Sequence, residues 1–224
     1  MSEQESTGEI DLRRHTQLAF ATPVVGYQWP DSEALNTGLS ALILQREQSQ
    51  AGATSRSSVG GWQSGLDLFA WGDEAIGGLK QRLESLLGPL LRSTMVDRPK
   101  SRIDYRVDGW ANVLRQGQYN TIHNHPGALW SGVYYVRVGQ PDRDRPKCGD
   151  LEFVDPRSGA NMVSPGDSVL DRGLRLRPSD GFMVLFPGWL QHFVHPYFGP
   201  GERITVAFNI VCSGIQPLSA DDEG

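Results

Sequence analysis

Four of the five histidines in this sequence gather in two segments. The segment GQYNTIHNHPGALWSGVYYVRV, at 117–138, contains His123 and His125. The segment GFMVLFPGWLQHFVHPYFGPGERITVAFN, at 181–209, contains His192 and His195. Histidine is the commonest metal ligand in proteins because its neutral imidazole offers a nitrogen lone pair. The two segments are therefore the first candidates for a metal site.

The spacing of these histidines predicts which of them share a face. Residues i and i+2 of a β-strand point the same way, so His123 and His125 are expected to project together. We expect His192 to join them from a later strand, whereas His195 is an odd step away and faces the opposite side. His15 is interpreted as an ordinary imidazole. Two ligands from one strand and one from another leave coordination positions open, as catalytic metal sites do.

The segments that must position these histidines have a β pattern. From residue 102 onward, short stretches rich in Val, Ile, Tyr and Phe are separated by Gly, Pro, Asp and Ser, which is typical of an all-β sandwich or barrel. We expect one domain over 1–224, mainly β (α+β overall), with a flexible N-terminus over about 1–16 and a β core over about 102–212. The irregular stretch 155–174 is a candidate functional loop.

Two helices are predicted ahead of this β core. Asp31 and Ser32 are expected to cap the first helix, and Asp73 is expected to cap the second. Both helices should pack outside the sheet. The apolar positions with helical spacing are Leu35, Leu39, Leu42 and Ile43 in the first, and Ile76, Leu79, Leu83, Leu86, Leu87, Leu90 and Leu91 in the second.

Two further N-terminal features are less regular. Residues 17–29 are predicted to be extended, and Pro23 places them at the edge of a sheet because proline cannot donate a ladder hydrogen bond. The stretch GGWQS at 60–64 places Trp62 in a loop-like context. A tryptophan that closes the edge of the core is the favoured interpretation, and a substrate contact is the alternative.

Composition excludes several classes of partner and compartment. The net charge of −5, with no run of basic residues, argues against nucleic acid and anionic membranes. Neither a signal-peptide core nor a run of 18 apolar residues occurs, and Cys148 and Cys212 do not form a disulfide framework. We expect a cytoplasmic protein, and the oligomeric state is left open.

The motifs in this order carry a family resemblance. Over about residues 18–211 the chain resembles the iron(II)- and 2-oxoglutarate-dependent oxygenases, the group that includes prolyl hydroxylases. It is most similar to a bacterial and phage branch with GGWQS near the front and SGVYY after HxH. The resemblance implies a double-stranded β-helix (jelly roll) with flanking helices. The matching pieces are Gly117-Gln118-Tyr119, His123-x-His125, Tyr134-Tyr135-Val136, Gly149 to Phe153, Pro178 to Phe186, His192, and Arg203-x-Thr205.

The resemblance also implies ligand roles. His123 and His192 match the two imidazole ligands of iron(II), and Arg203 matches the residue that binds the distal carboxylate of 2-oxoglutarate. A guanidinium fork suits bidentate capture of a planar carboxylate. Thr205 shares the face of Arg203, so its hydroxyl is expected to bind the same carboxylate.

The remaining expectations concern the co-substrate, whose position the resemblance implies, and the substrate. Tyr135 is expected to reach the co-substrate, with Tyr134 on the other face of the strand. Asn120, Trp130 and Trp189 lie close to the ligand positions in the sequence and are therefore candidates for the substrate side, although core packing explains both tryptophans equally well.

His125 departs from the family pattern, which most often has Asp or Glu there. Three neutral imidazoles would leave iron(II) with a formal charge of +2 instead of +1. Such a site is compatible with dioxygen chemistry, so we favour His125 as the third ligand. The alternative is a carboxylate from elsewhere, such as Asp150, Glu152 or Asp155.

The main hypothesis is a non-haem iron(II) oxygenase that consumes 2-oxoglutarate and O₂, releases succinate and CO₂, and hydroxylates a small molecule or a protein side chain. A cupin-type three-histidine dioxygenase is an alternative, since HxH opens the first cupin motif and Gly181, Pro187 and His192 fit part of the second. However, no Glu follows His125 at the cupin spacing, and Arg203 would then have no role. A non-catalytic jelly-roll binding protein is the third hypothesis.

Overall fold

The computed structural model describes residues 17, 19–52, 57–94, 101–159 and 173–217, which form two antiparallel sheets and two long helices. The six-stranded sheet has the order β1 (Val25–Gln28), β9 (Phe182–Pro187), β6 (Trp130–Arg137), β11 (Arg203–Pro217), β4 (Ser101–Leu114) and β3 (Trp62–Gln63). The five-stranded sheet has the order β2 (Ser58–Val59), β5 (Tyr119–His123), β10 (His192–Val194), β7 (Leu151–Phe153) and β8 (Leu174–Leu176). The remaining elements are α1 (Glu33–Ser49), the short 3₁₀ helix η2 (Leu68–Ala70) and α2 (Glu74–Thr94).

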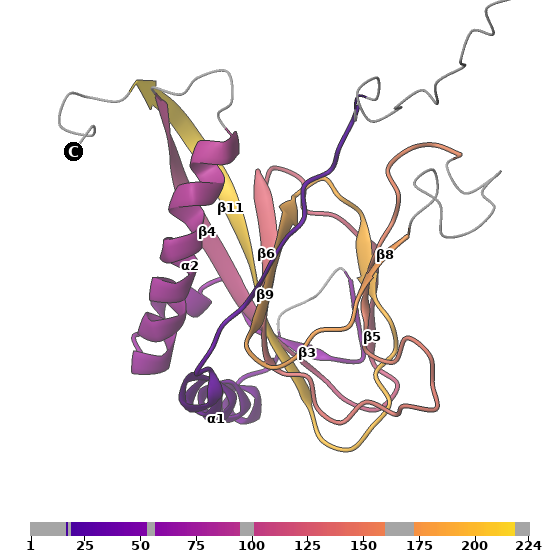
Figure 1. Cartoon of the computed structure of the whole chain (residues 1–224). Helices are drawn as coiled ribbons and strands as arrows, with labels where there is room; N and C mark the ends of the chain where they lie inside the picture. The colour runs from indigo at the N-terminus through magenta and orange to yellow at the C-terminus, as the bar shows by residue number, and fades with distance from the viewer. Residues whose placement is uncertain (1–16, 18, 53–56, 95–100, 160–172, 218–224) are drawn as a thin grey trace, which may run out of the picture.

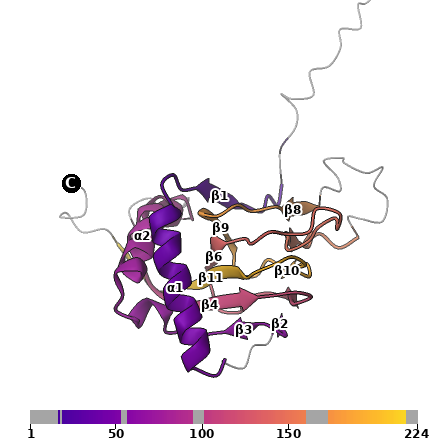
Figure 2. The ribbon, with the colours of Figure 1, turned by 90° about the horizontal axis from the view of Figure 1, so that it is seen from below.

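The layers are arranged as helices, large sheet and small sheet. In Figure 1, α1 and α2 lie on one side of the large sheet, and the strands of the small sheet lie on the other. Figure 2 shows the same arrangement from below, with both helices against one end of the stacked strands. Residues of both sheets, and none of α1 or α2, line the cavity that lies between the sheets.

Alternation along β11 explains why the large sheet has two different faces. Ile204, Val206 and Phe208 are buried on the helix side, where they join the larger hydrophobic core. Arg203 and Thr205 point into the space between the sheets. Because successive strand residues point to opposite faces, this one strand supplies both the core and the site.

Helix α2 follows its prediction closely. The Asp73 carboxylate accepts a hydrogen bond from the Ala75 backbone N–H at 2.8 Å, as an N-cap should. Of the predicted stripe, only Leu86 is incompletely buried. The fully buried members are Ile76, Leu79, Leu83, Leu87, Leu90 and Leu91.

The prediction that a side chain caps α1 is wrong. Ser32 occupies the cap position but makes no side-chain capping bond. Its hydroxyl donates to the Trp29 carbonyl at 2.9 Å and accepts from Arg82 at 2.7 Å. The hydroxyl is therefore used to join the strand–helix turn to α2, a tertiary contact that local sequence cannot reveal.

The N-terminal half contributes more to the sheets than expected. β1 is an edge strand, as predicted from Pro23, but β2 and β3 also add to both sheets from outside the predicted core of 102–212. The expected flexible N-terminus, 1–16, and most of the candidate loop 155–174 lie outside the described residues. No helix in the described part of the chain is long and apolar enough to cross a membrane.

The buried stripe of α2 generates a stability prediction. We expect Leu83→Ala to lower the free energy of unfolding by about 2–5 kcal/mol, because it opens a cavity against the sheet. Glu84→Ala, at an exposed position of the same turn, should change it by less than about 0.5 kcal/mol. Chemical denaturation of both variants measures this, and equal values for the two would contradict the packing described.

Candidate functional site

The three predicted histidines meet where β5 pairs with β10. His192 and His123 are direct partners across these antiparallel strands. β5 ends at His123, so His125 lies in the turn that follows and not in the strand. Its backbone N–H donates to the Gly188 carbonyl at 2.8 Å, which holds the turn against the chain leading into β10.

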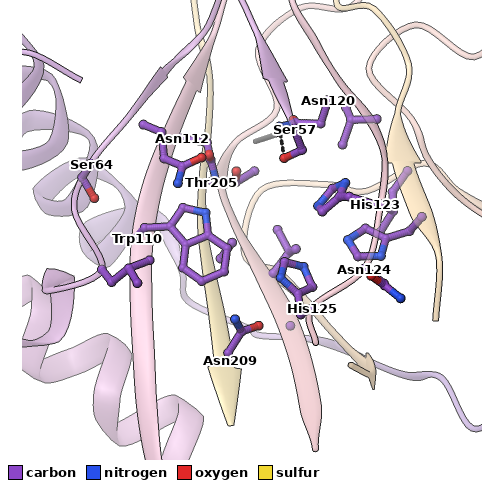
Figure 3. Close-up of a pocket in the computed structure, with 18 of the residues that line it drawn as sticks. Ser57, Ser64, Trp110, Asn112, Asn120, His123, Asn124, His125, Thr205 and Asn209 are labelled. Carbon is purple, nitrogen blue, oxygen red and sulfur yellow. Dashed lines mark hydrogen bonds between the residues drawn. The ribbon is translucent and has the colours of Figure 1, made fainter. Parts of the chain in front are cut away.

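The imidazole rings converge on one point. One nitrogen from each of His123, His125 and His192 lies within 4.8 Å of the others. The ring centroids are 4.3 Å apart for His123–His192, 5.1 Å for His123–His125 and 5.2 Å for His125–His192. Figure 3 shows His123 and His125 pointing into the same cavity.

Hydrogen bonds select the tautomer of two of these rings. Nδ1 of His123 lies 2.8 Å from the Thr121 carbonyl, and Nδ1 of His192 lies 2.9 Å from the Leu190 carbonyl. A carbonyl oxygen only accepts, so each Nδ1 carries the proton and each Nε2 keeps a free lone pair. This is the arrangement by which proteins orient metal-binding histidines.

The protonation state of the cluster also suits a metal. Burial lowers the pKa of His123 below its ordinary value. Burial, with a smaller contribution from His123, lowers the pKa of His125 to about 4 and that of His192 to about 3. All three rings are therefore neutral at pH 7 and present lone pairs rather than positive charges.

The alternative carboxylates are engaged elsewhere, and among the described residues the metal-binding cluster consists of the three histidines alone. Glu152 lies 2.8 Å from His195, on the outer face of the small sheet, so His195 faces away as expected. The other two acids form ion pairs, Asp150 with Arg175 and Arg177, and Asp155 with Arg157.

Arg203 lies in the same cavity and is nearly inaccessible, at 3% exposed. Its Nε donates to the Gly149 carbonyl at 3.2 Å, and its guanidinium carbon lies 5.2 Å from the centre of the Tyr135 ring. Among the described residues no carboxylate forms an ion pair with it. Burial lowers the pKa of Arg203, but a guanidinium remains charged at neutral pH. Within the described part of the chain, the Asp150 carboxylate raises the pKa of Arg203 from a distance, but no carboxylate pairs with the guanidinium directly.

Tyr135 and Thr205 stand beside Arg203 as expected. The two are direct partners across β6 and β11, and both are buried. The Tyr135 hydroxyl has no hydrogen-bond partner among the described residues, and burial raises the pKa of Tyr135 to about 12, so it remains a donor. Tyr134 points to the helix side, where its hydroxyl donates to Asn36 at 2.7 Å.

All these groups line one cavity of about 620 Å³ between the sheets, a volume typical of small-molecule sites. The metal cluster and Arg203 thus face a shared space.

Comparison with known proteins identifies this arrangement. Residues 108–209, just under half of the chain, match the model of a family described as "Putative 2OG-Fe(II) oxygenase". The matched span includes the three histidines, Tyr135, Arg203 and Thr205. Over this span the chain is similar to the 2OG-Fe(II) oxygenases. The description of that family names iron(II) and 2-oxoglutarate, the two groups that the sequence predicts for this site. No curated protein sequence matches it.

Solved structures show that the fold is shared. A Pseudomonas putida prolyl-4-hydroxylase is similar with a TM-score of 0.60 and 15% identity, covering 85% of this chain and 93% of that one. A Trichoplax adhaerens prolyl hydroxylase, in complex with a peptide fragment of hypoxia-inducible factor, has a TM-score of 0.63 and 14% identity, covering 84% and 83%. HygX from Streptomyces hygroscopicus, with nickel and 2-oxoglutarate bound, has a TM-score of 0.58 and 12% identity, covering 91% and 90%.

These comparisons confirm the family resemblance and the jelly roll predicted from the sequence. The single-domain organisation over 1–224 stays a prediction.

The structure distinguishes between the three candidates for the substrate side of the site. Asn120 lines the cavity. Trp130 does not: it packs in the core on the helix side, and its indole N–H donates to the Thr94 hydroxyl at 3.0 Å. That candidate is corrected in favour of core packing. Trp189 is 52% exposed and is not among the lining residues.

Other lining residues were missed. Trp110 and Asn112 of β4 point into the cavity with Thr205 and Asn209 of β11, as Figure 3 shows. The alternation in DGWANVL contains the signal, because polar Asn112 shares a strand face with Trp110. Trp62 fits the core-edge interpretation, since it packs against the core and its indole N–H donates to the Gln50 carbonyl at 3.2 Å. Its neighbour Gln63 lines the cavity.

The converging imidazoles predict one metal site per chain. We expect His192→Ala to weaken iron(II) binding by more than about 100-fold, because it removes a ligand. Loss of a residue that only orients a ligand typically weakens metal binding by about 10- to 100-fold. Anaerobic calorimetric titration with iron(II) measures this. His195→Ala is the matched control and should bind like the wild type, because that ring faces Glu152 on the other side of the sheet. Equal losses in both variants would contradict the assignment.

Proposed function

We propose that this oxygenase hydroxylates a carbon–hydrogen bond of a small molecule or of an exposed protein side chain, with iron(II) held by His123, His125 and His192. The observation that supports it most is the buried guanidinium of Arg203, which shares the cavity of the histidines and forms no ion pair with any described carboxylate. An unpaired buried charge is costly, so a site that retains one is organised to bind the opposite charge.

The donor set fits iron(II). Imidazole suits iron, and the free Nε2 atoms of His123 and His192 are directed by backbone carbonyls. The ring of His125 lacks such a bond to any described residue, so its position depends on the turn that carries it. Once bound, iron(II) would supply the activation of dioxygen together with 2-oxoglutarate.

The other residues would bind and orient the co-substrate. Arg203 can donate two parallel hydrogen bonds to the distal carboxylate, and Thr205 and Tyr135 add hydroxyl donors from adjacent strands. The apolar side chains of Val133, Leu151 and Val194 also line the cavity and would limit the access of water. The proteins of similar fold differ in substrate: one was solved with a peptide, and HygX with hygromycin B.

The alternatives lack a comparable observation. A cupin-type dioxygenase would give Arg203 no anion to bind, and a non-catalytic module would not need the neutral, oriented imidazoles. A cytoplasmic location stays our proposal on the composition of the sequence.

The role of Arg203 can be tested directly. We expect Arg203→Ala to weaken 2-oxoglutarate binding by about 100-fold or more, because a charge-assisted bidentate contact is lost. Arg203→Lys should recover part of the affinity, since it restores the charge without the planar fork. Binding is measured as the weak visible band that 2-oxoglutarate produces with iron(II) anaerobically, and turnover as succinate formed in air. Unchanged binding in Arg203→Ala would support the cupin-type alternative.

The third ligand has its own test. We expect His125→Ala to weaken iron(II) binding at least about tenfold, and His125→Asp to restore it, because a carboxylate oxygen can replace the imidazole nitrogen. Anaerobic iron(II) titration of both variants measures this. Wild-type affinity in His125→Ala would show that His125 is not a ligand.

A further inference from the structure

We propose that Gln63, Asn112 and Trp110 form the substrate subsite of the cavity, and that it accepts an uncharged group with the hydrogen-bonding character of a carboxamide. The inference rests on the proposed function, because it takes the metal and 2-oxoglutarate to occupy the histidine and Arg203 side.

The subsite begins with a row of polar side chains across four neighbouring strands. Gln63 pairs with Asn112, Asn112 pairs with Thr205, and Thr205 pairs with Tyr135. All four residues line the cavity. Thr205 and Tyr135 are assigned to the co-substrate through their position beside Arg203, so the two amides extend the same row beyond it.

Asn112 gives the strongest indication that this row binds a ligand. It is only 8% exposed, and no side-chain hydrogen bond joins it to any described residue. Gln63, half-buried next to it, likewise makes none. A buried amide without partners is unfavourable, because it has lost its hydrogen bonds to water. Each side-chain amide has an NH₂ group that donates and a carbonyl oxygen that accepts. A ligand group that satisfies both must itself have an acceptor and a donor.

Trp110 places this amide pair next to the reacting centre. It lies two residues before Asn112 on the same face of β4, and its ring centroid is 5.7 Å from that of His125. It is 8% exposed, so its accessible surface is turned to the cavity, as Figure 3 shows. A substrate held by the amides would rest on a flat apolar ring beside the proposed metal ligands.

The charge of the lining argues for a neutral substrate group. Arg203 is the one Lys, Arg, Asp or Glu among the described residues that line the cavity. The proposed function uses that charge for 2-oxoglutarate. A charged substrate group would be removed from water and would find no counter-charge in the cavity, which is costly. A neutral amide has a small desolvation cost, because Gln63 and Asn112 replace its hydrogen bonds to water.

The test uses the full chain loaded with zinc(II), a redox-silent substitute, and saturated with 2-oxoglutarate. The probes are N-acetylglycine N-methylamide, which is neutral, N-acetylglycine, which is anionic, and glycinamide, which is cationic. The readout is the ¹⁵N–¹H resonance of the Trp110 indole, assigned by its loss in Trp110→Phe. We expect a saturable shift with the neutral probe and binding at least about tenfold weaker for the charged ones.

The variants locate the contact. Gln63→Ala and Asn112→Ala should each lower the affinity for the neutral probe about fivefold, which is the effect of losing one hydrogen bond. The near-isosteric Gln63→Glu should shift the preference toward glycinamide. Asn124→Ala is the matched control, because its amide already donates to the Trp189 carbonyl at 3.4 Å, and it should bind the probe like the wild type.

The other outcomes overturn one proposal or the other. Charged probes that bind as well as the neutral one would overturn the inference. So would an Asn112→Ala variant that loses affinity for 2-oxoglutarate and keeps it for the amide, because Asn112 would then belong to the co-substrate. If 2-oxoglutarate itself does not bind while the amide does, the proposed function fails and the amide subsite stands.

Discussion

The antiparallel register of β11 is the constraint on which the rest of the structure depends. This strand pairs with β4 along its whole length and with β6 over its first half. A shift of one residue would turn Arg203 and Thr205 toward the helices and expose Ile204 and Val206 to the cavity. The hydrophobic core and the candidate site therefore require the same register. Only that register buries the apolar side chains on the helix side and directs the site residues into the cavity.

The two faces of the large sheet have opposite energetic characters. On the helix side, leucines of α2 and the apolar residues of β11, β6 and β9 form a continuous core. On the cavity side lie three neutral imidazoles, together with a guanidinium and a tyrosine hydroxyl that have no ion-pair or hydrogen-bond partner among the described residues. Groups of this kind reduce stability while they have no ligand. The helix-side packing compensates for a cavity that is arranged for binding.

Backbone carbonyls contribute to the site as much as side chains do. The Thr121 and Leu190 carbonyls set the tautomers of His123 and His192. In each case the carbonyl belongs to the residue two positions before the histidine, so the chain entering the β5–β10 pair orients its own ligands. No carbonyl of a described residue orients the His125 ring in this way, and His125 is also the residue that departs from the family pattern. The metal site thus has two oriented ligands and one whose position depends on a turn.

The sequence alone determined the local properties. Period-two spacing was sufficient to predict that Arg203 and Thr205 share a face and that Tyr135 and Tyr134 do not, and helical spacing predicted the buried face of α2. These follow from backbone geometry over a few residues. Spacing could not place Trp130, because its indole meets Thr94 from α2, nor the Ser32 hydroxyl, which joins α2 instead of capping α1.

Only the tertiary structure decided which distant groups meet. Gln63 and Asn112 are neighbours because β3 pairs with β4, and His192 faces His123 because β10 pairs with β5. It also decided that the candidate carboxylates are occupied by basic partners, which leaves three histidines to form the cluster. The reason is physical: strand faces repeat every second residue in any sequence, but pairing partners and desolvation arise only when the whole chain has folded.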